Sequence, residues 1–263
     1  MDFPPLSYWG GTFCASTKHG NTLRIGFVNI RGFGSSSYAP KNKQFACFAA
    51  AYEFDVIGTA ENNVNWKSVP IADRPLDRSL GWWQSRHVSY SFITSDPVMH
   101  GVKEQRGGTA VWTRNSLVHR ASEKGGDSLG HRAWTRFRGQ NNQWLRVVSA
   151  YCPVVNTSDL NSTYNQQLRL LPSTSRHPRD TFLVDLQSTL AQWSALGDLL
   201  IVMLDANQDV RFGALAQVFG ELDMINAMYD PSLPLFHQPV LPTGPGHLPI
   251  DGIFVSRSIH PSL

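Results

Sequence analysis

The sequence predicts an α/β sandwich, in which β-sheets form the inside and helices cover the outside. Apolar strand-like runs alternate with helix-like runs along the chain, and the eight Trp favour a sheet-rich core. The apolar fraction of 41% and the charged fraction of 16% suit a globular protein with a substantial core. Because no shift in composition marks a boundary, we expect one domain over residues 23–263, preceded by a loose leader over residues 1–22.

The first part of the chain is predicted to consist mostly of strands. An apolar run over residues 23–30 predicts a strand, residues 41–52 predict a helix, and residues 55–61 predict a second strand. A long connection rich in Asp, Pro and Trp follows. Further strands are expected over residues 83–92, 108–114, 133–139 and 144–152.

The second part is predicted to contain more helix. Residues 163–171 form one candidate helix, and residues 178–196 form a stronger one, with Pro178 in its first turn and Gly197 just after its end. The strand over residues 199–207 is apolar on both faces, as expected of a central buried strand. A further helix over residues 212–228 and a last strand over residues 250–259 complete the expected elements.

Cysteine usage and the apolar runs bear on the compartment. Cys14, Cys47 and Cys152 are odd in number and widely spaced, so they form neither a disulfide framework nor a metal-binding pair. The N-terminus has no basic segment followed by an apolar one, and apolar runs such as residues 199–204 are too short to span a bilayer. We therefore expect a soluble intracellular protein, nuclear or cytoplasmic, with no membrane partner.

Polar side chains end four of the predicted strands. Asn29, Glu61 and Tyr151 each follow a row of apolar residues on the same strand face, and Asp205 and Asn207 together follow a fourth such row. A buried carboxylate is costly unless it is paired, bound to metal or open to a cleft. Each residue alone could be an ordinary strand-end cap or turn residue. Taken together, they indicate one shared polar site at the carboxyl ends of the strands.

A basic segment over residues 103–146 suggests a negatively charged partner. It contains nine Lys and Arg against three acids, a local net charge of +6, whereas the whole chain has a net charge of +3. Trp112, Trp134 and Trp144 lie within it. Cations interleaved with aromatic residues suit a nucleic acid, although an ordinary solvated strand face has the same composition. The candidate nucleic-acid-binding residues are Arg106, Arg114, Arg132, Arg136, Arg138 and Arg146.

Six segments, in order, resemble motifs of the endonuclease/exonuclease/phosphatase superfamily. They are RIGFVNIRGF with Asn29, DVIGTAE with Glu61, GGTAVWTR, VVSAYCP with Tyr151, IVMLDANQD with Asp205 and Asn207, and IDGIFVS with Asp251. The Asn-Ile-Arg-Gly and Tyr-x-Pro segments look most like the endonuclease domains of non-LTR retrotransposons. The resemblance implies a DNase I-like fold, a four-layer αββα sandwich, and an endonuclease that hydrolyses DNA with the help of Mg²⁺.

The resemblance also implies a role for each residue that matches a motif. Glu61 would bind Mg²⁺, with Mn²⁺ as the alternative ion, and Asn29 would help to hold the metal or the phosphate. Asp205 would orient or deprotonate the attacking water, and Asn207 and Tyr151 would donate hydrogen bonds to phosphate oxygens. Asp251 is similar to the residue that lies near the metal and the catalytic His in the superfamily.

The end of the sequence departs from this pattern. The superfamily has a Ser-Asp-His motif on a strand about two dozen residues after the Ile-Asp strand, but here twelve residues follow Asp251, and His260 has no preceding Asp. We therefore expect a domain without its final strand and with weak or absent nuclease activity. The alternatives are an inactive nucleic-acid-binding remnant, or a phosphodiesterase or phosphatase that acts on a lipid headgroup or a nucleotide.

Overall fold

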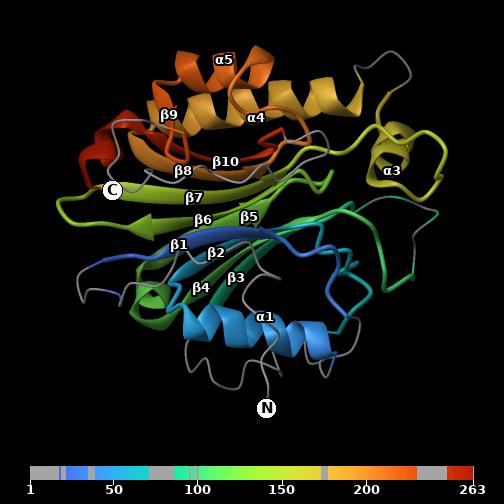
Figure 1. Ribbon diagram of the computed structural model, residues 1–263, viewed down its shortest axis with the longest axis horizontal. Helices are drawn as coiled ribbons and strands as arrows, with labels where there is room; N and C mark the ends of the chain where they lie inside the picture. Colours follow the sequence, from blue (N-terminus) through green and yellow to red (C-terminus); the bar gives the residue numbers. More distant parts are fainter. Residues whose placement is uncertain are drawn as a thin grey trace.

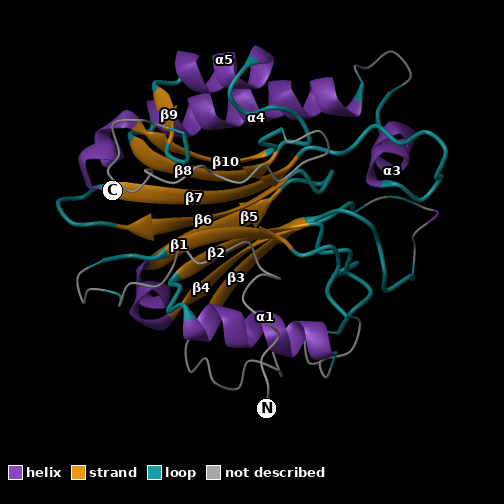
Figure 2. Ribbon diagram, viewed as in Figure 1, coloured by secondary structure: helices purple, strands orange, loops and turns teal. Residues whose placement is uncertain are grey.

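A computed structural model shows four layers, with two β-sheets packed face to face between helices (Figure 1). Helix α1 (Pro40–Ala51) covers the outer face of one sheet, and α4 (Pro178–Ala195) and α5 (Gly213–Glu221) cover the other (Figure 2). The αββα sandwich expected from the sequence is confirmed. The structure describes residues 18, 22–34, 39–70, 86–94, 96, 98, 101–172, 177–229 and 248–262.

The first sheet has four strands in the order β1-β2-β4-β3. Its strands β1 and β2 run parallel, and the other neighbours are antiparallel. Parallel neighbours need a crossover connection, and α1 provides it between β1 and β2. The bounds are β1 Ile25–Asn29, β2 Val56–Ala60, β3 Arg86–Ser91 and β4 Thr109–Arg114.

The second sheet has six strands in the order β5-β6-β7-β8-β10-β9. Strands β7 and β8 are parallel, and α3 (Thr163–Leu170) and α4 lie in the crossover between them. The other neighbours are antiparallel. The bounds are β5 Ala121–Gly126, β6 Arg132–Arg138, β7 Trp144–Tyr151, β8 Asp198–Asp205, β9 Met224–Asn226 and β10 Asp251–Ser256, with 3₁₀ helices at Asn115–Arg120 and Arg257–Ser262.

Three apolar cores hold the layers together. One lies between α1 and the first sheet, a second lies between the second sheet and the helices α4 and α5, and the third lies between the sheets. In the third core Met203 of β8 packs against β2 at Gly58, where a Cβ atom would come within 2.7 Å of the Met203 Cε atom. The absence of a side chain at Gly58 therefore lets the two sheets approach each other.

Three expectations about individual elements need correction. The helix expected over residues 212–228 ends at Glu221, because Asp223 adopts a left-handed conformation (φ 52°) and the chain then forms β9. Strand β5 was not expected, because its sequence ASEKGG lacks apolar alternation and most of its residues are exposed. The last strand ends at Ser256 and continues as a 3₁₀ helix. The leader expected over residues 1–22 lies almost wholly outside the described residues.

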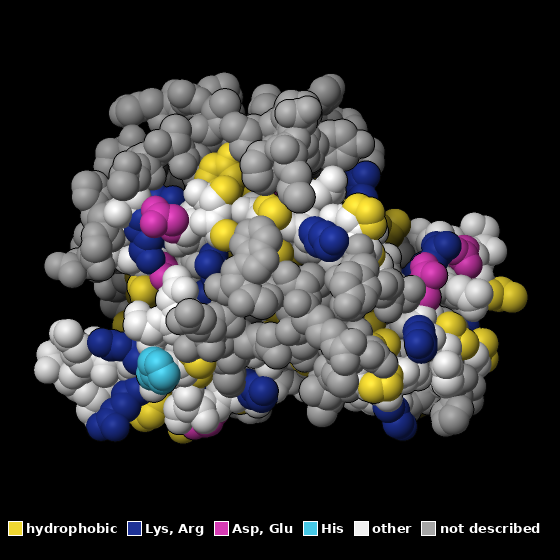
Figure 3. Space-filling view, turned by 90° about the horizontal axis from the view of Figure 1, so that it is seen from below, with side chains coloured by type: hydrophobic (Ala, Val, Ile, Leu, Met, Phe, Trp, Pro, Cys, Tyr) yellow, Lys and Arg dark blue, Asp and Glu magenta, His cyan; other side chains and the backbone are white. Residues whose placement is uncertain are grey.

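The face beside α1 carries Lys and Arg side chains that are scattered among apolar and uncharged ones (Figure 3). They do not gather into one continuous patch in the part of this face that the structure describes. Within the described ranges, the helices are all too short or too polar to cross a membrane.

Candidate active site

The topology brings the polar strand ends to one edge of the sandwich. Parallel neighbours end at the same edge of a sheet, so β1 ends beside β2, and β7 ends beside β8. In register, Tyr151 lies opposite Asp205, and Asp251, which begins the antiparallel strand β10, lies opposite Asp205 on its other side.

Asn29 joins the two sheets at this edge. Its Nδ2 atom donates a hydrogen bond to Oδ2 of Asp205 over 2.7 Å, between residues 176 positions apart in the sequence. Its Oδ1 atom accepts a hydrogen bond from the backbone N–H of Arg31 over 2.9 Å. With one donor and one acceptor engaged, the orientation of the Asn29 amide is fixed.

Asp205 is buried, with 2% of its surface exposed. Its Oδ1 atom accepts a hydrogen bond from the backbone N–H of Asn207 over 3.2 Å. Burial and then the negative charges of Asp251 and Glu61 raise the pKa of Asp205 to about 7, although the hydrogen bond from Asn29 opposes this rise. A carboxylate with a pKa near neutrality is suited to accept a proton from water.

Tyr151 lies among the acids at this edge. Burial raises the pKa of its hydroxyl far above the ordinary value, and the charges of Glu61 and Asp205 and a hydrogen bond with Glu61 add to the rise. The hydroxyl therefore remains protonated and able to donate a hydrogen bond.

Glu61 occupies an unusual backbone conformation just after β2. Its φ angle is 49°, in the left-handed region that residues with a Cβ atom adopt infrequently. Its carbonyl accepts a hydrogen bond from the N–H of Gly32 over 2.6 Å, and the next two residues hydrogen-bond to the backbone of residues 107 and 108. Asn207 after β8 is left-handed as well (φ 48°), and its Nδ2 atom donates to the carbonyl of Cys152 over 2.8 Å.

Two further residues lie near this edge, and no sequence motif marked either of them. Lys41 of α1 donates a hydrogen bond to the carbonyl of Arg31 over 3.0 Å. Burial and the charge of Arg31 lower the pKa of Lys41, and the charge of Glu61 opposes this shift. Tyr229, which follows β9, lies close enough to Asp251 that burial and the charge of Asp251 raise its pKa. Lys41 could be mistaken for a surface residue of a helix, and Tyr229 comes directly after the helix that was expected over residues 212–228.

Neither a model of any known protein family nor any curated protein sequence matches the chain. Solved structures do resemble it. The AP endonuclease of Leishmania major superimposes with a TM-score of 0.61 at 14% identity, over 90% of this chain and 80% of that one. The catalytic domain of human Nocturnin superimposes with a TM-score of 0.56 at 13% identity, over 89% of this chain and 83% of that one. The catalytic domain of Xenopus laevis APE2 does so with a TM-score of 0.55 at 16% identity, over 90% of this chain and 83% of that one.

The chain has the DNase I-like fold. Within this DNase I-like sandwich, the polar edge lies at the carboxyl ends of β1, β2, β7 and β8, where the sequence led us to expect one shared site.

The donor atoms at this edge suit a hard divalent cation. Glu61, Asp205 and Asp251 provide carboxylate oxygens, and Asn29 provides an amide oxygen, although in the described part of the chain no three His, Cys, Asp or Glu side chains form a ready metal cluster. Mg²⁺ retains several waters and needs only one or two protein carboxylates, so the absence of such a cluster does not conflict with it. In chemical type, these residues fit Mg²⁺.

Four of the candidate nucleic-acid-binding arginines are buried or part-buried and have partners within the protein. Arg114 is 9% exposed, and its guanidinium donates to the carbonyl of Ala49 over 2.6 Å. Arg132 donates to the hydroxyl of Thr189 over 2.7 Å. Both Arg136 and Arg146 pair with Asp198 over 2.8 Å.

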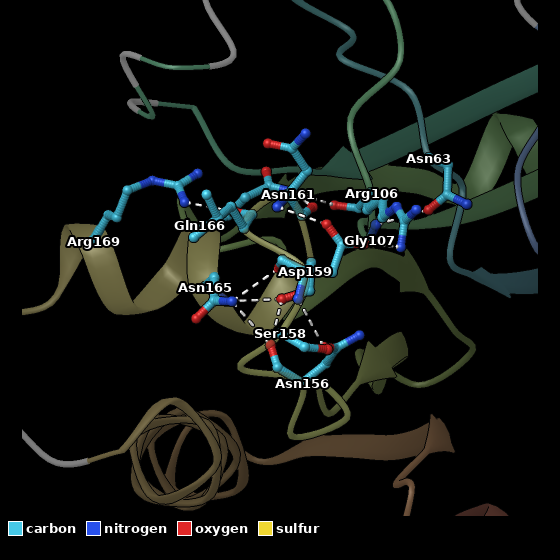
Figure 4. A network of polar contacts seen from close by, with 12 residues as sticks. Asn63, Arg106, Gly107, Asn156, Ser158, Asp159, Asn161, Asn165, Gln166 and Arg169 are labelled. Atoms are coloured by element: carbon cyan, nitrogen blue, oxygen red, sulfur yellow. Dashed lines mark hydrogen bonds and ion pairs between the residues drawn. The ribbon is translucent and has the colours of Figure 1, made fainter.

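The remaining two, Arg106 and Arg138, lie at the surface. Arg138 is exposed at the end of β6. Arg106 is 56% exposed in its side chain and pairs with Asp159 over 2.6 Å, within a network of polar contacts that joins its loop to the segment before α3 (Figure 4). His260 falls in the last 3₁₀ helix, and its side chain lies outside the described part of the chain.

Proposed function

We propose that this chain is a metal-dependent phosphodiesterase domain that acts on DNA, of the type found as the endonuclease of non-LTR retrotransposons. The observation that supports it best is the joining of Asn29 to Asp205 at an edge that also holds Glu61, Tyr151 and Asp251. Structures of AP endonucleases and of a Neisserial 3′ phosphatase bound to a product DNA hairpin share the fold, which adds support for a nucleic-acid substrate.

In this proposal Asp205 accepts the proton of the attacking water. Asn29 and the backbone N–H of Asn207 each hold one of its two oxygens, so the carboxylate has a fixed orientation. Its pKa of about 7 lets it receive a proton near neutral pH. The water would attack phosphorus, and the P–O bond on the opposite side would break.

Two neighbours of Asp205 act as hydrogen-bond donors in the proposed reaction. The hydroxyl of Tyr151 stays protonated, and it can turn from Glu61 to a phosphate oxygen. The amide of Asn207 uses one N–H for the carbonyl of Cys152 and keeps the other, because an amide nitrogen has two hydrogens. Both groups would stabilise negative charge at phosphorus as the water attacks.

Glu61 and Asn29 are the proposed metal-binding residues, and Asp251 lies opposite Asp205 in the neighbouring strand. A bound Mg²⁺ or Mn²⁺ would offset the charge that develops on the phosphate and the leaving oxygen. The negative charges that act on Asp205 and Tyr151 at this edge would attract a cation.

The proposal is tested by incubating the protein with supercoiled plasmid in Mg²⁺, in Mn²⁺ and in EDTA. We expect nicking in Mg²⁺ or Mn²⁺ and none in EDTA. A gel shift at several salt concentrations measures binding separately, since phosphate contacts make the affinity for DNA fall steeply with salt. Salt-sensitive binding without nicking would favour the inactive remnant. The absence of both DNA binding and nicking would contradict the proposal.

A further inference from the structure

A cavity of about 400 Å³ lies beside the candidate active site, between the first turns of α4 and α5. Its wall includes Cys152 and Ala206, the sequence neighbours of Tyr151 and Asp205. Successive residues of a strand point to opposite faces, so Ala206 and Asp205 lie on opposite sides of the same strand end. The cavity and the candidate carboxylate are thus separated by a single strand end.

The lining of the cavity is suited to a flat ring with polar substituents. Cys152, Phe182, Leu183 and Leu215 supply an apolar floor. Burial raises the pKa of the Cys152 thiol to about 12, so this group is neutral and contributes to the apolar surface. The rim of the cavity is polar. The volume of the cavity falls within the range of small-molecule pockets. The polar rim residues are Arg179, Asp180, Gln208 and Asp209.

An exposed aromatic ring and a guanidinium lie at the mouth of the cavity. Phe212 is 67% exposed, which is unusual for a Phe, and the guanidinium of Arg211 lies 5.2 Å from the centre of its ring. Asp209 holds Arg211 through two hydrogen bonds of 3.0 and 2.7 Å. The planar groups are therefore positioned before any ligand binds, and bases of single-stranded nucleic acids stack on such side chains.

Tyr229 links this mouth to the candidate catalytic edge. The charges of Asp251, Arg211 and Asp209 all act on its hydroxyl, whose pKa is raised by burial and then by Asp251. Tyr229 therefore lies near both Asp251 and the Asp209–Arg211 pair.

We infer that the cavity and its Phe212–Arg211 mouth form a subsite for one nucleobase of the substrate. The inference rests on the proposed function, because it takes a nucleic acid as the substrate. The carboxylate of Asp180 would repel a phosphate but accept hydrogen bonds from the amino groups of a base, whereas both oxygens of Asp209 are engaged with Arg211. Arg179 is bound to the carbonyl of Pro153 over 2.8 Å and to the side chain of Gln208 over 2.7 Å, so it is engaged as a structural group.

The test uses a fluorescent nucleotide, 2-aminopurine deoxyriboside 5′-monophosphate, titrated in EDTA into the full chain. Its fluorescence changes on stacking, and deoxyribose 5-phosphate serves as a competitor that lacks the base. We expect Phe212→Ala to weaken binding at least about fivefold, since stacking on an aromatic side chain contributes of that order. Ala214→Trp, at an exposed residue of the cavity wall, is expected to abolish binding by filling the space.

Leu196→Ala is the matched control, because Leu196 is 68% exposed at the far end of α4 and does not line the cavity. It is expected to bind the nucleotide as the unaltered protein does. The inference would be overturned if both cavity variants bound the nucleotide as tightly as the unaltered protein, or if the unaltered protein did not bind it. It would also be overturned if deoxyribose 5-phosphate displaced the nucleotide as well as unlabelled nucleotide does. The anisotropy of a labelled DNA oligonucleotide, measured in parallel, reports on the proposed function, so failure of the one can be told from failure of the other.

Discussion

Asn29 and Asp205 are hydrogen-bonded over 2.7 Å across the space between the two sheets. Asn29 ends β1 of the four-stranded sheet, and Asp205 ends β8 of the six-stranded sheet. Their contact ties the two sheets together at the edge where the other candidate catalytic groups lie. It also places a neutral donor on a buried carboxylate whose pKa is raised by the negative charges of Asp251 and Glu61.

Replacing Asn29 is expected to impair the site more than the fold. In Asn29→Ala the Oδ2 atom of Asp205 loses its donor, and a hydrogen bond to a charged group contributes about 1.5–3 kcal/mol. Hydrolysis of a phosphodiester should therefore slow roughly ten- to a hundredfold. Asn29→Asp should slow it further, because a second carboxylate would then face Asp205 at hydrogen-bonding distance. Equal rates for Asn29→Asp and the unaltered protein would contradict this role.

Asp205→Asn is expected to abolish hydrolysis and leave the fold intact. The amide cannot accept a proton from water, and it removes a buried negative charge that faces Asp251 and Glu61. The free energy of unfolding, measured with urea, should consequently be equal or higher. Asp223→Asn is the control, because this exposed carboxylate pairs with Arg257 at the surface and should have no effect on the rate. Residual activity in Asp205→Asn would mean that another group accepts the proton.

Much of the fold could be predicted from the sequence, because its central strands are either apolar on both faces or end in polar residues. The strand expected over residues 199–207 is β8, which is buried almost throughout. Edge elements were harder to predict, since β5 and β9 are held by pairing with β6 and β10 and have little apolar pattern of their own. Their formation depends on the neighbours that the fold supplies.

The site could be predicted in part for a related reason. Asn29, Glu61, Tyr151 and Asp205 end strands, and strand topology decides that they meet. Lys41 and Tyr229 reach the same edge from a helix and from a loop, where no periodicity marks a functional residue. Net charge alone could not separate arginines that pair within the protein from those at its surface. Arg146 illustrates this, because its guanidinium lies 4.3 Å from the rings of both Trp134 and Trp193.

Arg146→Met is expected to destabilise the protein. The Arg146 side chain is 3% exposed, and its partner Asp198 is fully buried, so the change leaves a buried carboxylate with only Arg136 to pair with. Breaking a buried pair in this way costs about 3–5 kcal/mol, and the remaining Arg136 favours the lower end of that range. Urea unfolding measures the effect, and Arg138→Met, at an exposed residue of the same strand pair, is the control.

The same two variants test the expected contact between these arginines and DNA. If Arg146 binds a phosphate, its replacement should lower the salt dependence of binding by about 0.9 per phosphate contact. Because its guanidinium is enclosed by Asp198 and two Trp rings, we expect no change in that slope for Arg146→Met and a decrease for Arg138→Met. A decrease in the slope for Arg146→Met, with no change for Arg138→Met, would mean that Arg146 contacts DNA and Arg138 does not.

Asp127 is expected to make the fold sensitive to acid. Its carboxylate accepts hydrogen bonds from the hydroxyl of Ser91 and from the backbone N–H groups of His131 and Arg132. Burial alone would raise its pKa, but the hydrogen bond and charge of His131, with smaller contributions from Arg132 and Ser91, hold the pKa at about 2. A folded-state pKa below the ordinary value means that the ionised form stabilises the fold. That contribution is complete above about pH 4 and is lost as the pH falls through 2.

At pH 7 the contribution of Asp127 amounts to about 2 kcal/mol. Asp127→Asn should lower the free energy of unfolding by about that amount at pH 7, whereas near pH 2 the two proteins should differ little. Urea unfolding of both proteins between pH 2 and pH 7 measures the difference. A difference that stays constant across this range would mean that Asp127 acts through packing or neutral hydrogen bonds, and that its ionisation does not stabilise the loop between β5 and β6.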